Sequence, residues 1–592
     1  MTRIVNDPAD FADEALAGFC DVHADLVRQV PGGAVRRRRP ARPKVAVLVG
    51  GGSGHYPAFA GLVGQGFADG AVVGNIFTSP SAQQAVSVAR AAESGAGVVF
   101  AYGNYAGDVM NFGLASERLA GLGIRAENVL VTDDVASAPP AEASRRRGIA
   151  GDFVVFKAMG AAAEAGLDLD EVVRLGRRAN DRTRTLGTAF SGCTFPGADA
   201  PLFTLPEGHM GLGLGIHGEP GLRDVPLPGA DELGRTLVEG VLAEAPDDAR
   251  TAAARRTAGA GTRARIAVVL NGLGSTKHEE LFVLWNAVAP RLRDAGYEIV
   301  APEVGEVVTS LDMAGASLTV TWLDDELEPL WLAPAETPAY RRGRVAAADG
   351  LEATHDDGEP AAAAGAAPSS APSREYAAAC VAALGAARVA LEALEAQLGA
   401  MDAVAGDGDH GRGMVRGVGA AHSAARDALE AGCGAGSVLA AAGDAWADRA
   451  GGTSGVLWGA GLRAWGEAIG DLEVPGAPGV AAGVGAFSDR IAALGGAQPG
   501  EKTLVDALVP FEEELRAGVV RGDALGEAWE RACRAAEEAA RATAGLRPLK
   551  GRARPLAEKS LGTPDPGATS LAAVFAAMGP SIVTAAFQEV SA

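Results

Sequence analysis

Residues 44–57 read KVAVLVGGGSGHYP, an apolar and β-branched run that passes directly into four glycines and a histidine. Such a run followed by glycines is typical of a buried strand with a ligand-binding turn at its end. Similar runs alternate with helical patterns along the first half of the chain, at 97–100, 128–132 and 266–270. This alternation predicts an α/β fold with ligand loops at the C-terminal ends of strands. Glycines and prolines cluster at 190–225, where we expect a break between two α/β subdomains.

Residues 346–373 separate two regions that differ in composition and in apolar periodicity. They are rich in Ala, Pro, Ser and acid without apolar periodicity, which predicts a flexible linker. The following region, 374–592, is rich in Ala and Leu, with apolar residues at helical spacing in 377–398 and 525–544. The sequence therefore predicts a multidomain chain, with an α/β half at 1–345 and an all-helical half after the linker.

Composition excludes several classes of protein. A chain of 592 residues is too long to fold around a single hydrophobic core, so several domains are expected. A formal charge of −22 argues against nucleic acid or an anionic membrane surface as partner. The five cysteines lack paired spacing, which predicts reduced, packed thiols. The first residues lack the apolar core of a signal peptide, and we expect no segment with the roughly 20 apolar residues of a membrane helix. These observations predict a cytoplasmic protein.

The first candidate site is the glycine-rich turn before His55. Gly52, Ser53 and Gly54 would let the backbone approach a ligand closely, and His55 is placed as a base or hydrogen-bond donor near neutral pH. The alternative is a tight turn in which His55 is structural. The turn is not a Walker A loop, because Gly-Lys-Ser/Thr does not occur in the chain.

Two further loops of this half contain candidate polar residues. Asp108, in GNYAGD after a predicted strand, could hold a sugar hydroxyl or orient a base; an ordinary turn residue is the alternative. Residues 210–221, MGLGLGIHGEPG, match GxGxxG, but the Glu-Pro-Gly that follows would break the helix of a dinucleotide fingerprint. The remaining candidate is His217, whose neutral imidazole is a competent nucleophile toward a ketone; a bracing role in the loop is the alternative.

Carboxylates and glycines gather in the helical half. Asp402, Asp407 and Asp409 offer the hard oxygen ligands that magnesium prefers, and an EF-hand is excluded because the twelfth position from Asp407 is Val418. The segment GGTSG at 451–455 precedes a helical stretch and suits a phosphate cradle, although each motif alone could be a helix–helix loop. The predicted nucleotide-binding residues are Gly452, Thr453, Ser454, Gly455, Arg552, Asp565 and Gly567.

Taken together and in this order, the motifs resemble the single-chain dihydroxyacetone kinase family over nearly the whole chain. The matching stretches are GGGSGH at 50–55, NYAGD at 104–108, GIHGEPG at 215–221, GDGDHG at 406–411, GGTSG at 451–455, EKTLVDAL at 501–508 and DPGATS at 565–570.

The resemblance implies a kinase that transfers the γ-phosphate of ATP to a small ketose. It implies that His217 forms a covalent hemiaminal with the substrate carbonyl and that His55 and Asp108 contact the hydroxyls and assist proton removal. The three aspartates of the carboxylate motif would hold two magnesium ions on the nucleotide. The resemblance also implies a homodimer and an eight-helix barrel for the C-terminal half.

Four positions depart from the dihydroxyacetone-specific pattern. Tyr56, Phe59, Gly103 and Gly211 stand where Glu, His, Lys and Glu are usual. Glycine in place of the lysine is expected to open room near Asp108, with the two aromatics as a new wall, which suits a four-carbon ketose. The GHYPAF form resembles the erythrulose kinase branch. We therefore expect phosphorylation of D-erythrulose to its 4-phosphate, with Tyr56 and Gly103 among the substrate-binding residues.

Other activities stay open at this stage. Dihydroxyacetone is the alternative substrate, followed by L-erythrulose. A phosphoprotein-dependent system would keep the two halves on separate chains, so their fusion favours free ATP as donor. The intact carboxylate motif argues against a non-catalytic ketose sensor, whereas a lyase that forms a cyclic product from FAD is compatible with the sequence.

Overall fold

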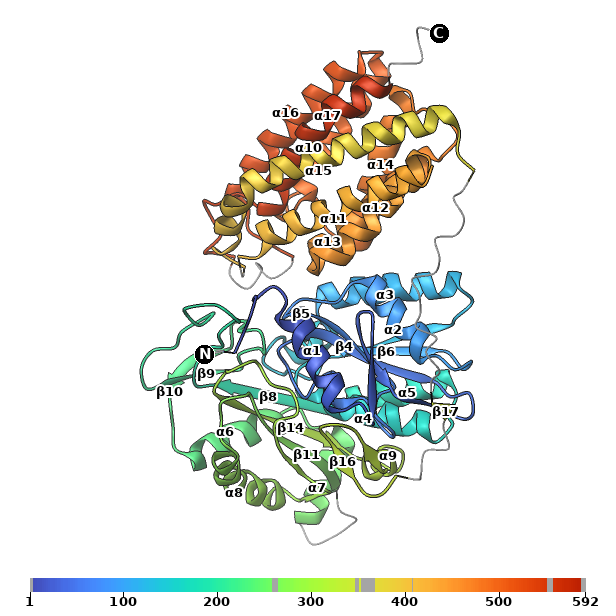
Figure 1. Cartoon of the computed structure of the whole chain (residues 1–592). Helices are drawn as coiled ribbons and strands as arrows, with labels where there is room; N and C mark the ends of the chain where they lie inside the picture. Colours follow the sequence, from blue (N-terminus) through green and yellow to red (C-terminus); the bar gives the residue numbers. More distant parts are fainter. Residues whose placement is uncertain are drawn as a thin grey trace. The chain divides into compact units, whose positions relative to one another are not determined.

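The computed structural model describes residues 4–257, 264–345, 351–352, 368–406, 408–550 and 557–586. The chain divides into two compact units, the first drawn mainly from residues before 346 and the second mainly from residues after 367 (Figure 1). The first unit is α/β and the second is helical throughout its described residues, which confirms the predicted fold class. All five cysteines are free thiols, as predicted.

Six strands form the first sheet, in the order β1-β2-β5-β4-β6-β7. The four strands from β5 to β7 in this order are parallel, whereas β1 and β2 pair antiparallel at one edge. The apolar run 44–49 is continuous because both faces of β4 are buried, as is usual in parallel sheets. The strands are β1 (Val27–Val30), β2 (Gly33–Arg36), β4 (Ala46–Ser53), β5 (Gly70–Ile76), β6 (Val98–Gly103) and β7 (Ala126–Val131).

The second sheet has seven strands, in the order β10-β9-β8-β14-β11-β12, with β13 also paired to β11. Along the chain, the first strand of this sheet is β8, which starts at Thr183. Residues 190–225 therefore lie within this sheet and its loops, not between the two sheets as expected. The strands are β8 (Thr183–Ala189), β9 (His209–Leu212), β10 (Arg223–Pro226), β11 (Ala264–Gly272), β12 (Tyr297–Ile299), β13 (Glu303–Gly305) and β14 (Gly315–Trp322). Short pairs join β3 (Arg38–Arg39) to β17 (Leu351–Glu352) and β15 (Ala335–Glu336) to β16 (Arg341–Arg342).

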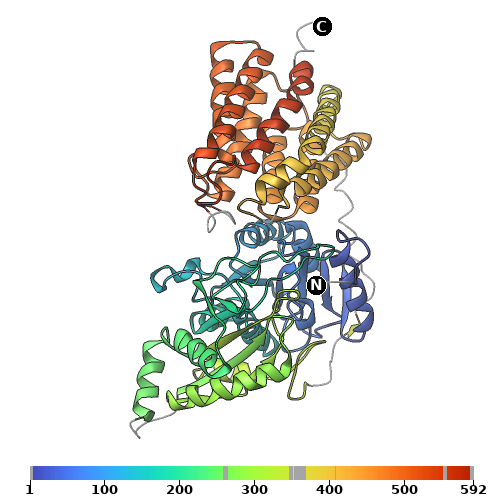
Figure 2. The same cartoon turned by 90° about the vertical axis from the view of Figure 1, so that its left-hand side faces the viewer.

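One hydrophobic core joins the two sheets. Side chains of β11 alternate in direction: Val268 belongs to a core with α6 and α8, whereas Val269 belongs to the core that also contains β4, β6 and α4. The helices α6 and α8 lie beside the second sheet (Figures 1 and 2). α4 is buried along almost its whole length and contacts strands of both sheets. The α-helices of this unit are α1 (Phe11–Val22), α2 (Ala82–Ala92), α3 (Ala106–Gly121), α4 (Gly151–Glu164), α5 (Leu169–Asp181), α6 (Ala230–Leu242), α7 (Asp247–Thr257), α8 (His278–Asp294) and α9 (Leu327–Leu332); short 3₁₀ turns are η1 (Ala60–Leu62) and η2 (Pro140–Arg145).

Eight α-helices make up the described part of the second unit, as the resemblance implies. Aromatic rings fill the interior: Trp446 stacks on Trp458 with centroids 4.8 Å apart, and Phe575 meets several further rings. Small residues bring α12 and α13 close together, because a Cβ on Gly459 would lie 2.4 Å from the Gly443 carbonyl oxygen. The helices are α10 (Ala371–Asp402), α11 (His410–Glu430), α12 (Ala435–Ala450), α13 (Gly452–Ile469), α14 (Ala477–Gly495), α15 (Val505–Arg521), α16 (Leu525–Ala542) and α17 (Pro566–Ala586), with the 3₁₀ turn η3 (Thr543–Gly545) between the last two.

The expectation that no segment is long and apolar enough for a membrane helix is wrong. α10 and α17 both meet that test by length and composition. Both are helices of the folded second unit, where α17 packs against α10, α15 and α16 and buries residues such as Phe575 and Met578. Their apolar composition is explained by this packing.

Most of the predicted linker lies outside the described residues, but its last three residues are helical. α10 begins at Ala371 because the Ser370 hydroxyl oxygen accepts a hydrogen bond from the Ser373 N–H (3.1 Å) and Pro372 occupies the first turn. The Ser373 hydroxyl in turn accepts from the Ala435 N–H (3.0 Å). The helical unit therefore needs residues that precede 374.

We predict that fragments 1–345 and 368–592 each fold alone, because each unit has its own core. A fragment starting at 374 should be less stable than one starting at 368 by at least about 1 kcal/mol, since it lacks the Ser370 cap. Thermal unfolding of the three fragments measures this difference. Equal stability of the two helical fragments would show that the cap is unimportant.

Candidate active site

The glycine-rich segment before His55 belongs to β4, which continues to Ser53, four residues further than predicted. A Cβ on Gly52 would lie 2.5 Å from the Thr78 backbone nitrogen, and the Ser53 hydroxyl donates to the Gly74 carbonyl oxygen (2.6 Å). These small residues thus admit neighbouring backbone of the protein itself. Their contact with substrate stays a prediction.

His55 enters the site because Gly54 turns the chain with φ +103°, a conformation that favours glycine. The His55 ring lies in a buried position, with Nδ1 2.7 Å from the Thr309 carbonyl oxygen and Nε2 3.0 Å from His217 Nε2. A carbonyl oxygen only accepts, so Nδ1 carries the proton and Nε2 offers a lone pair. Burial, together with the charge of His217, lowers the pKa of His55 to about 3.

Aromatic rings enclose the two histidines. Phe77 stacks on His55 with ring centroids 4.9 Å apart and an interplanar angle of 13°, and it meets His217 edge-on at 4.9 Å. Tyr105 meets His217 at 4.7 Å and 83°. Sequence reasoning assigned neither ring a role. Tyr105 at least lies within the quoted NYAGD motif, whereas no local pattern points to Phe77.

His217 lies in the loop between β9 and β10, where it is held by Glu219. The Glu219 carboxylate accepts from His217 Nδ1 and from the His217 backbone N–H, both at 3.0 Å. Burial opposes ionisation of Glu219, but the charges of His217 and Arg147 hold its pKa well below the usual range. Arg147 Nη1 lies 3.8 Å from Glu219, and Arg147 Nη2 lies 2.7 Å from Asp134. Glu219 is inside the GIHGEPG motif, yet its role was not predicted.

Asp108 occupies the first turn of α3, just after the end of β6, so it is not the ordinary turn residue of the alternative. It is buried, and its charge contributes to raising the pKa values of Tyr102 and Asp152, for both of which burial is the larger cause. Asp152, in the first turn of α4, has its pKa raised well above the usual value and is a second buried acid that the sequence did not indicate. Support of His55 by Asp108 stays a prediction.

The two aromatics expected to form one wall lie in different surroundings. Phe59 is buried, with its ring centroid 6.3 Å from that of His55. Tyr56 is half exposed, and its ring meets the edge of Phe19 on α1 at 6.0 Å. Of the two, Phe59 is the one whose ring lies beside that of His55.

Gly103 does not open the space expected near it. A Cβ at this position would lie 2.9 Å from the Tyr105 ring and 3.2 Å from the Gly148 carbonyl oxygen, so the Tyr105 ring takes up the space beside it. Gly211, in β9, is likewise closed in, because its Cβ would lie 1.8 Å from Leu214 Cδ1. The size argument for a four-carbon substrate therefore has no support at Gly103.

Acidic side chains converge in the helical unit. Asp402 ends α10 and Asp409 caps α11; burial and the charge of Asp402 raise the pKa of Asp409 to about 6. Asp565 has its pKa raised to about 7 by burial, with further contributions from Asp506 and Asp402. Buried acids that repel one another in this way fit a divalent cation. Among the described residues no three such groups form a complete metal site, and the third predicted ligand, Asp407, lies outside them.

The predicted phosphate cradle is the start of a helix. Residues 452–455 form the first turn of α13, and Gly451 precedes them with φ +67°. The free N–H groups of such a turn attract anions. Gly567 lies in the first turn of α17, where the Asp565 carboxylate accepts from the Ala568 N–H (2.7 Å). Arg552 lies outside the described residues.

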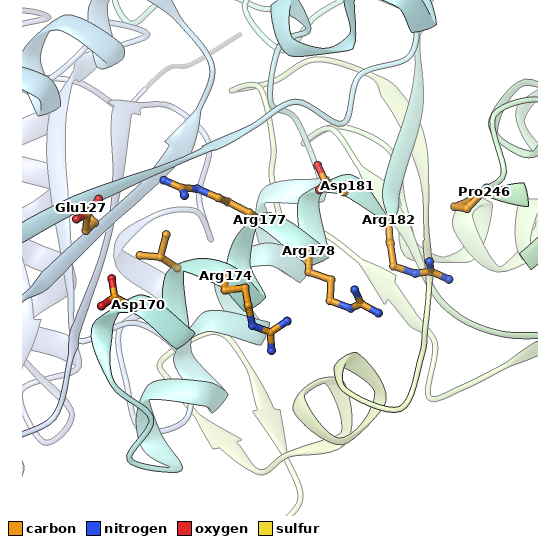
Figure 3. A pocket seen from close by; sticks show the side chains of 9 residues that line it. Glu127, Asp170, Arg174, Arg177, Arg178, Asp181, Arg182 and Pro246 are labelled. Carbon is orange, nitrogen blue, oxygen red and sulfur yellow. The ribbon is translucent and has the colours of Figure 1, made fainter. Parts of the chain in front are cut away.

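A surface cavity of about 690 Å³ lies away from all these motifs, on α5 (Figure 3). Its lining residues are Glu127, Asp170, Val173, Arg174, Arg177, Arg178, Asp181, Arg182 and Pro246. Three of its arginines pair with carboxylates: Arg174 with Glu326, Arg178 with Asp324 and Arg182 with Asp248. These neighbouring carboxylates compensate the charge of the three arginines.

Comparison with known proteins agrees with this arrangement. The Dak1 domain matches residues 17–339 and the DAK2 domain matches residues 404–579. The D-erythrulose kinase of Mycolicibacterium smegmatis is 58% identical over 97% of each chain. The L-erythrulose kinase of Pectobacterium atrosepticum is 54% identical over 98% of this chain and 96% of its own. The structure of the dihydroxyacetone kinase from C. freundii in complex with AMP-PNP and Mg²⁺ matches with a TM-score of 0.51 and 28% identity, covering 98% of this chain and 99% of that one.

An α/β unit joined to an all-helical unit, each with its own polar site, defines a two-part kinase that phosphorylates an alcohol group. The chain belongs to the dihydroxyacetone kinase family, in the branch that contains the erythrulose kinases.

The low pKa of His55 predicts a pH-dependent contribution to stability. The folded state keeps His55 neutral, whereas the unfolded state binds a proton below about pH 6.5, so folding loses stability as the pH falls from 6.5 toward 3. We expect the free energy of unfolding of the wild type, relative to His55→Gln, to fall by up to about 1.4 kcal/mol per pH unit in this range. Urea unfolding at several pH values measures it. His209→Gln, at a partly exposed position, is the control variant for loss of a histidine elsewhere in the unit.

Proposed function

We propose that this protein is an ATP-dependent erythrulose kinase that converts D-erythrulose to its 4-phosphate. The observation that carries the proposal is the partly buried contact between the Nε2 atoms of His55 and His217, at 3.0 Å. It joins a nucleophile suited to a ketone carbonyl to a base suited to a hydroxyl. The 58% identity to a D-erythrulose kinase supports the choice of substrate, and the 54% identity to an L-erythrulose kinase makes the other enantiomer the second candidate.

In the proposed mechanism, the ketose is captured as a hemiaminal through Nε2 of His217. His55 is suited to take the proton of the primary hydroxyl as that oxygen attacks the γ-phosphorus, because Nδ1 keeps its proton and donates to the Thr309 carbonyl oxygen, which leaves the lone pair on Nε2. Asp108, buried in the first turn of α3, would support this step. The proposed substrate contacts also include Gly52, Ser53, Gly54, Tyr56 and Gly103.

The helical unit would hold the nucleotide. Asp402 and Asp409, with Asp407, would hold magnesium, which when bound neutralises charge on the phosphates. The N–H groups at the start of α13 would hold phosphate oxygens, with Thr453 and Ser454 as further donors. Positioning and charge neutralisation are the main requirements of phosphoryl transfer.

We further propose that residues 1–345 are the ketose unit and 368–592 the nucleotide unit, since α10 begins at Ala371 with Ser370 as its cap. A homodimer in the cytoplasm, free of nucleic acid and membrane, is also proposed. A formal charge of −22 and the packing of α10 and α17 within the helical unit support the last two points.

A panel of acceptors tests the substrate. With ATP and Mg²⁺, kcat/KM for D-erythrulose should exceed that for L-erythrulose and for dihydroxyacetone by about tenfold or more, equal to about 1.4 kcal/mol of transition-state discrimination. ADP release measured under one set of conditions gives the three values. A tenfold preference for either competitor would overturn the D-erythrulose assignment and leave the kinase assignment standing.

The magnesium assignment is tested at Asp409. Asp409→Asn removes a hard anionic ligand and should lower kcat by about 100-fold or more without loss of the fold. Asp427→Asn, at an exposed position near the other end of α11, is the matched control and should leave kcat unchanged. Normal turnover of the Asp409 variant at saturating magnesium would contradict the assignment.

A further inference from the structure

The hydrogen-bond partners of the two histidines define where their protons lie. Thr309 supplies a carbonyl oxygen, so His55 Nδ1 donates and His55 Nε2 is an acceptor. The 3.0 Å contact between the two Nε2 atoms then requires His217 Nε2 to donate. His217 Nδ1 faces a Glu219 carboxylate oxygen at 3.0 Å and must donate as well. His217 therefore carries protons on both ring nitrogens.

We propose that Glu219 is a positioning residue that holds His217 as an imidazolium, with Nε2 directed at His55. This inference rests on the proposed kinase function of the site. It also corrects the expectation that His217 waits as a neutral imidazole, since the resting ring is charged and paired.

Glu219 acts on the ring and on the loop together. One carboxylate oxygen accepts from His217 Nδ1 and the other accepts from the His217 backbone N–H. The carboxylate folds back over its own loop so closely that a Cβ on Gly215 would lie 2.1 Å from it. Gly218 completes the turn with φ +77°. The glycine at position 215 is thus explained by the space that the Glu219 side chain requires.

The charges behind His217 alternate in sign. Imidazolium, Glu219, Arg147 and Asp134 follow one another, with Arg147 Nη1 3.8 Å from Glu219 and Arg147 Nη2 2.7 Å from Asp134. Asp134 is almost fully buried, and Arg147 and Glu219 are mostly buried. Buried charges are tolerated when they are paired with charges of opposite sign, so this row of alternating charges stabilises a positive charge on His217.

The same pairing suits covalent capture, because the charge does not change. His217 Nε2 passes its proton to the lone pair of His55 Nε2, and its own freed pair forms the bond to the carbonyl carbon. The C=O π electrons move to the oxygen, which takes the proton back from His55. The ring then bears carbon on Nε2 and a proton on Nδ1, and it is still an imidazolium. Glu219 therefore faces a cation before and after the step.

Two variants of Glu219 separate the effect of its negative charge from that of its side-chain length. Glu219→Gln keeps the length and an acceptor but removes the charge, whereas Glu219→Asp keeps the charge but shortens the reach. We expect Glu219→Gln to lower kcat/KM for the ketose by about 10- to 100-fold, the value of a hydrogen bond to a charged group. The ketose-to-glycerol ratio of kcat/KM should fall with it, because only the adduct requires a carbonyl. Glu219→Asp should recover part of the loss if charge is the main factor.

The protonation state is read directly by ¹⁵N NMR of the full-length protein labelled at histidine, without ketose, at pH 7.5. The His217 signals are those lost in His217→Ala. Both ring nitrogens should be protonated in the wild type and one should be unprotonated in Glu219→Gln. Glu244→Gln is the matched control: it removes a mostly buried ion pair to Arg146 and should lower thermal stability while leaving these signals and the kinetic ratio unchanged.

The outcomes separate this inference from the proposed function. Absence of ATP-dependent ketose phosphorylation by the wild type would refute the kinase proposal alone, since the NMR result does not depend on turnover. An unprotonated His217 nitrogen in the wild type would refute the role of Glu219, even if Glu219→Gln fails to fold. Wild-type kcat/KM and an unchanged ketose-to-glycerol ratio in a folded Glu219→Gln would refute it as well.

Discussion

The hydrogen bond between His55 and His217 is the interaction on which the first unit depends. His55 follows the last residues of β4 in the first sheet, whereas His217 comes from a loop between β9 and β10 of the second. The two rings meet because one core, containing α4, joins the sheets. A third segment, before β14, supplies the Thr309 carbonyl that sets the tautomer of His55. Small displacements of one sheet against the other would therefore separate the two rings.

The two units treat buried charge in opposite ways. Around His217 each charge has a partner of opposite sign, so the site is electrically complete within the protein. In the helical unit, Asp409 and Asp565 have raised pKa values because burial and neighbouring acids disfavour their ionised forms. The first arrangement suits an uncharged ketose, and the second suits a cation with its nucleotide. This electrostatic contrast is a physical reason for a division of labour between the units.

Some sequence-based expectations failed because they concerned packing. The continuous apolar run at 44–49 correctly predicted a buried strand, although β4 spans Ala46–Ser53 and includes three of the glycines expected in the turn. A Cβ on Gly52 would meet the backbone of Thr78, which follows β5. Glycine at position 103, where a lysine is usual in the family, suggested open space, yet the Tyr105 ring lies there. α17 reads as a core helix only once its neighbours are known. The sequence gives the size of the side chain at each position, but the fold determines which other residues fill the space beside a small one.

The sequence by itself determined the α/β and all-helical halves, because strand and helix periodicity are local properties of the chain. It also determined which histidines and aspartates are the candidates for chemistry, since the motifs that contain them are short and contiguous. Only the tertiary structure decided how these groups are charged. Protonation depends on burial and on partners such as Thr309 and Arg147, which lie far from His55 and His217 in sequence and carry no motif of their own.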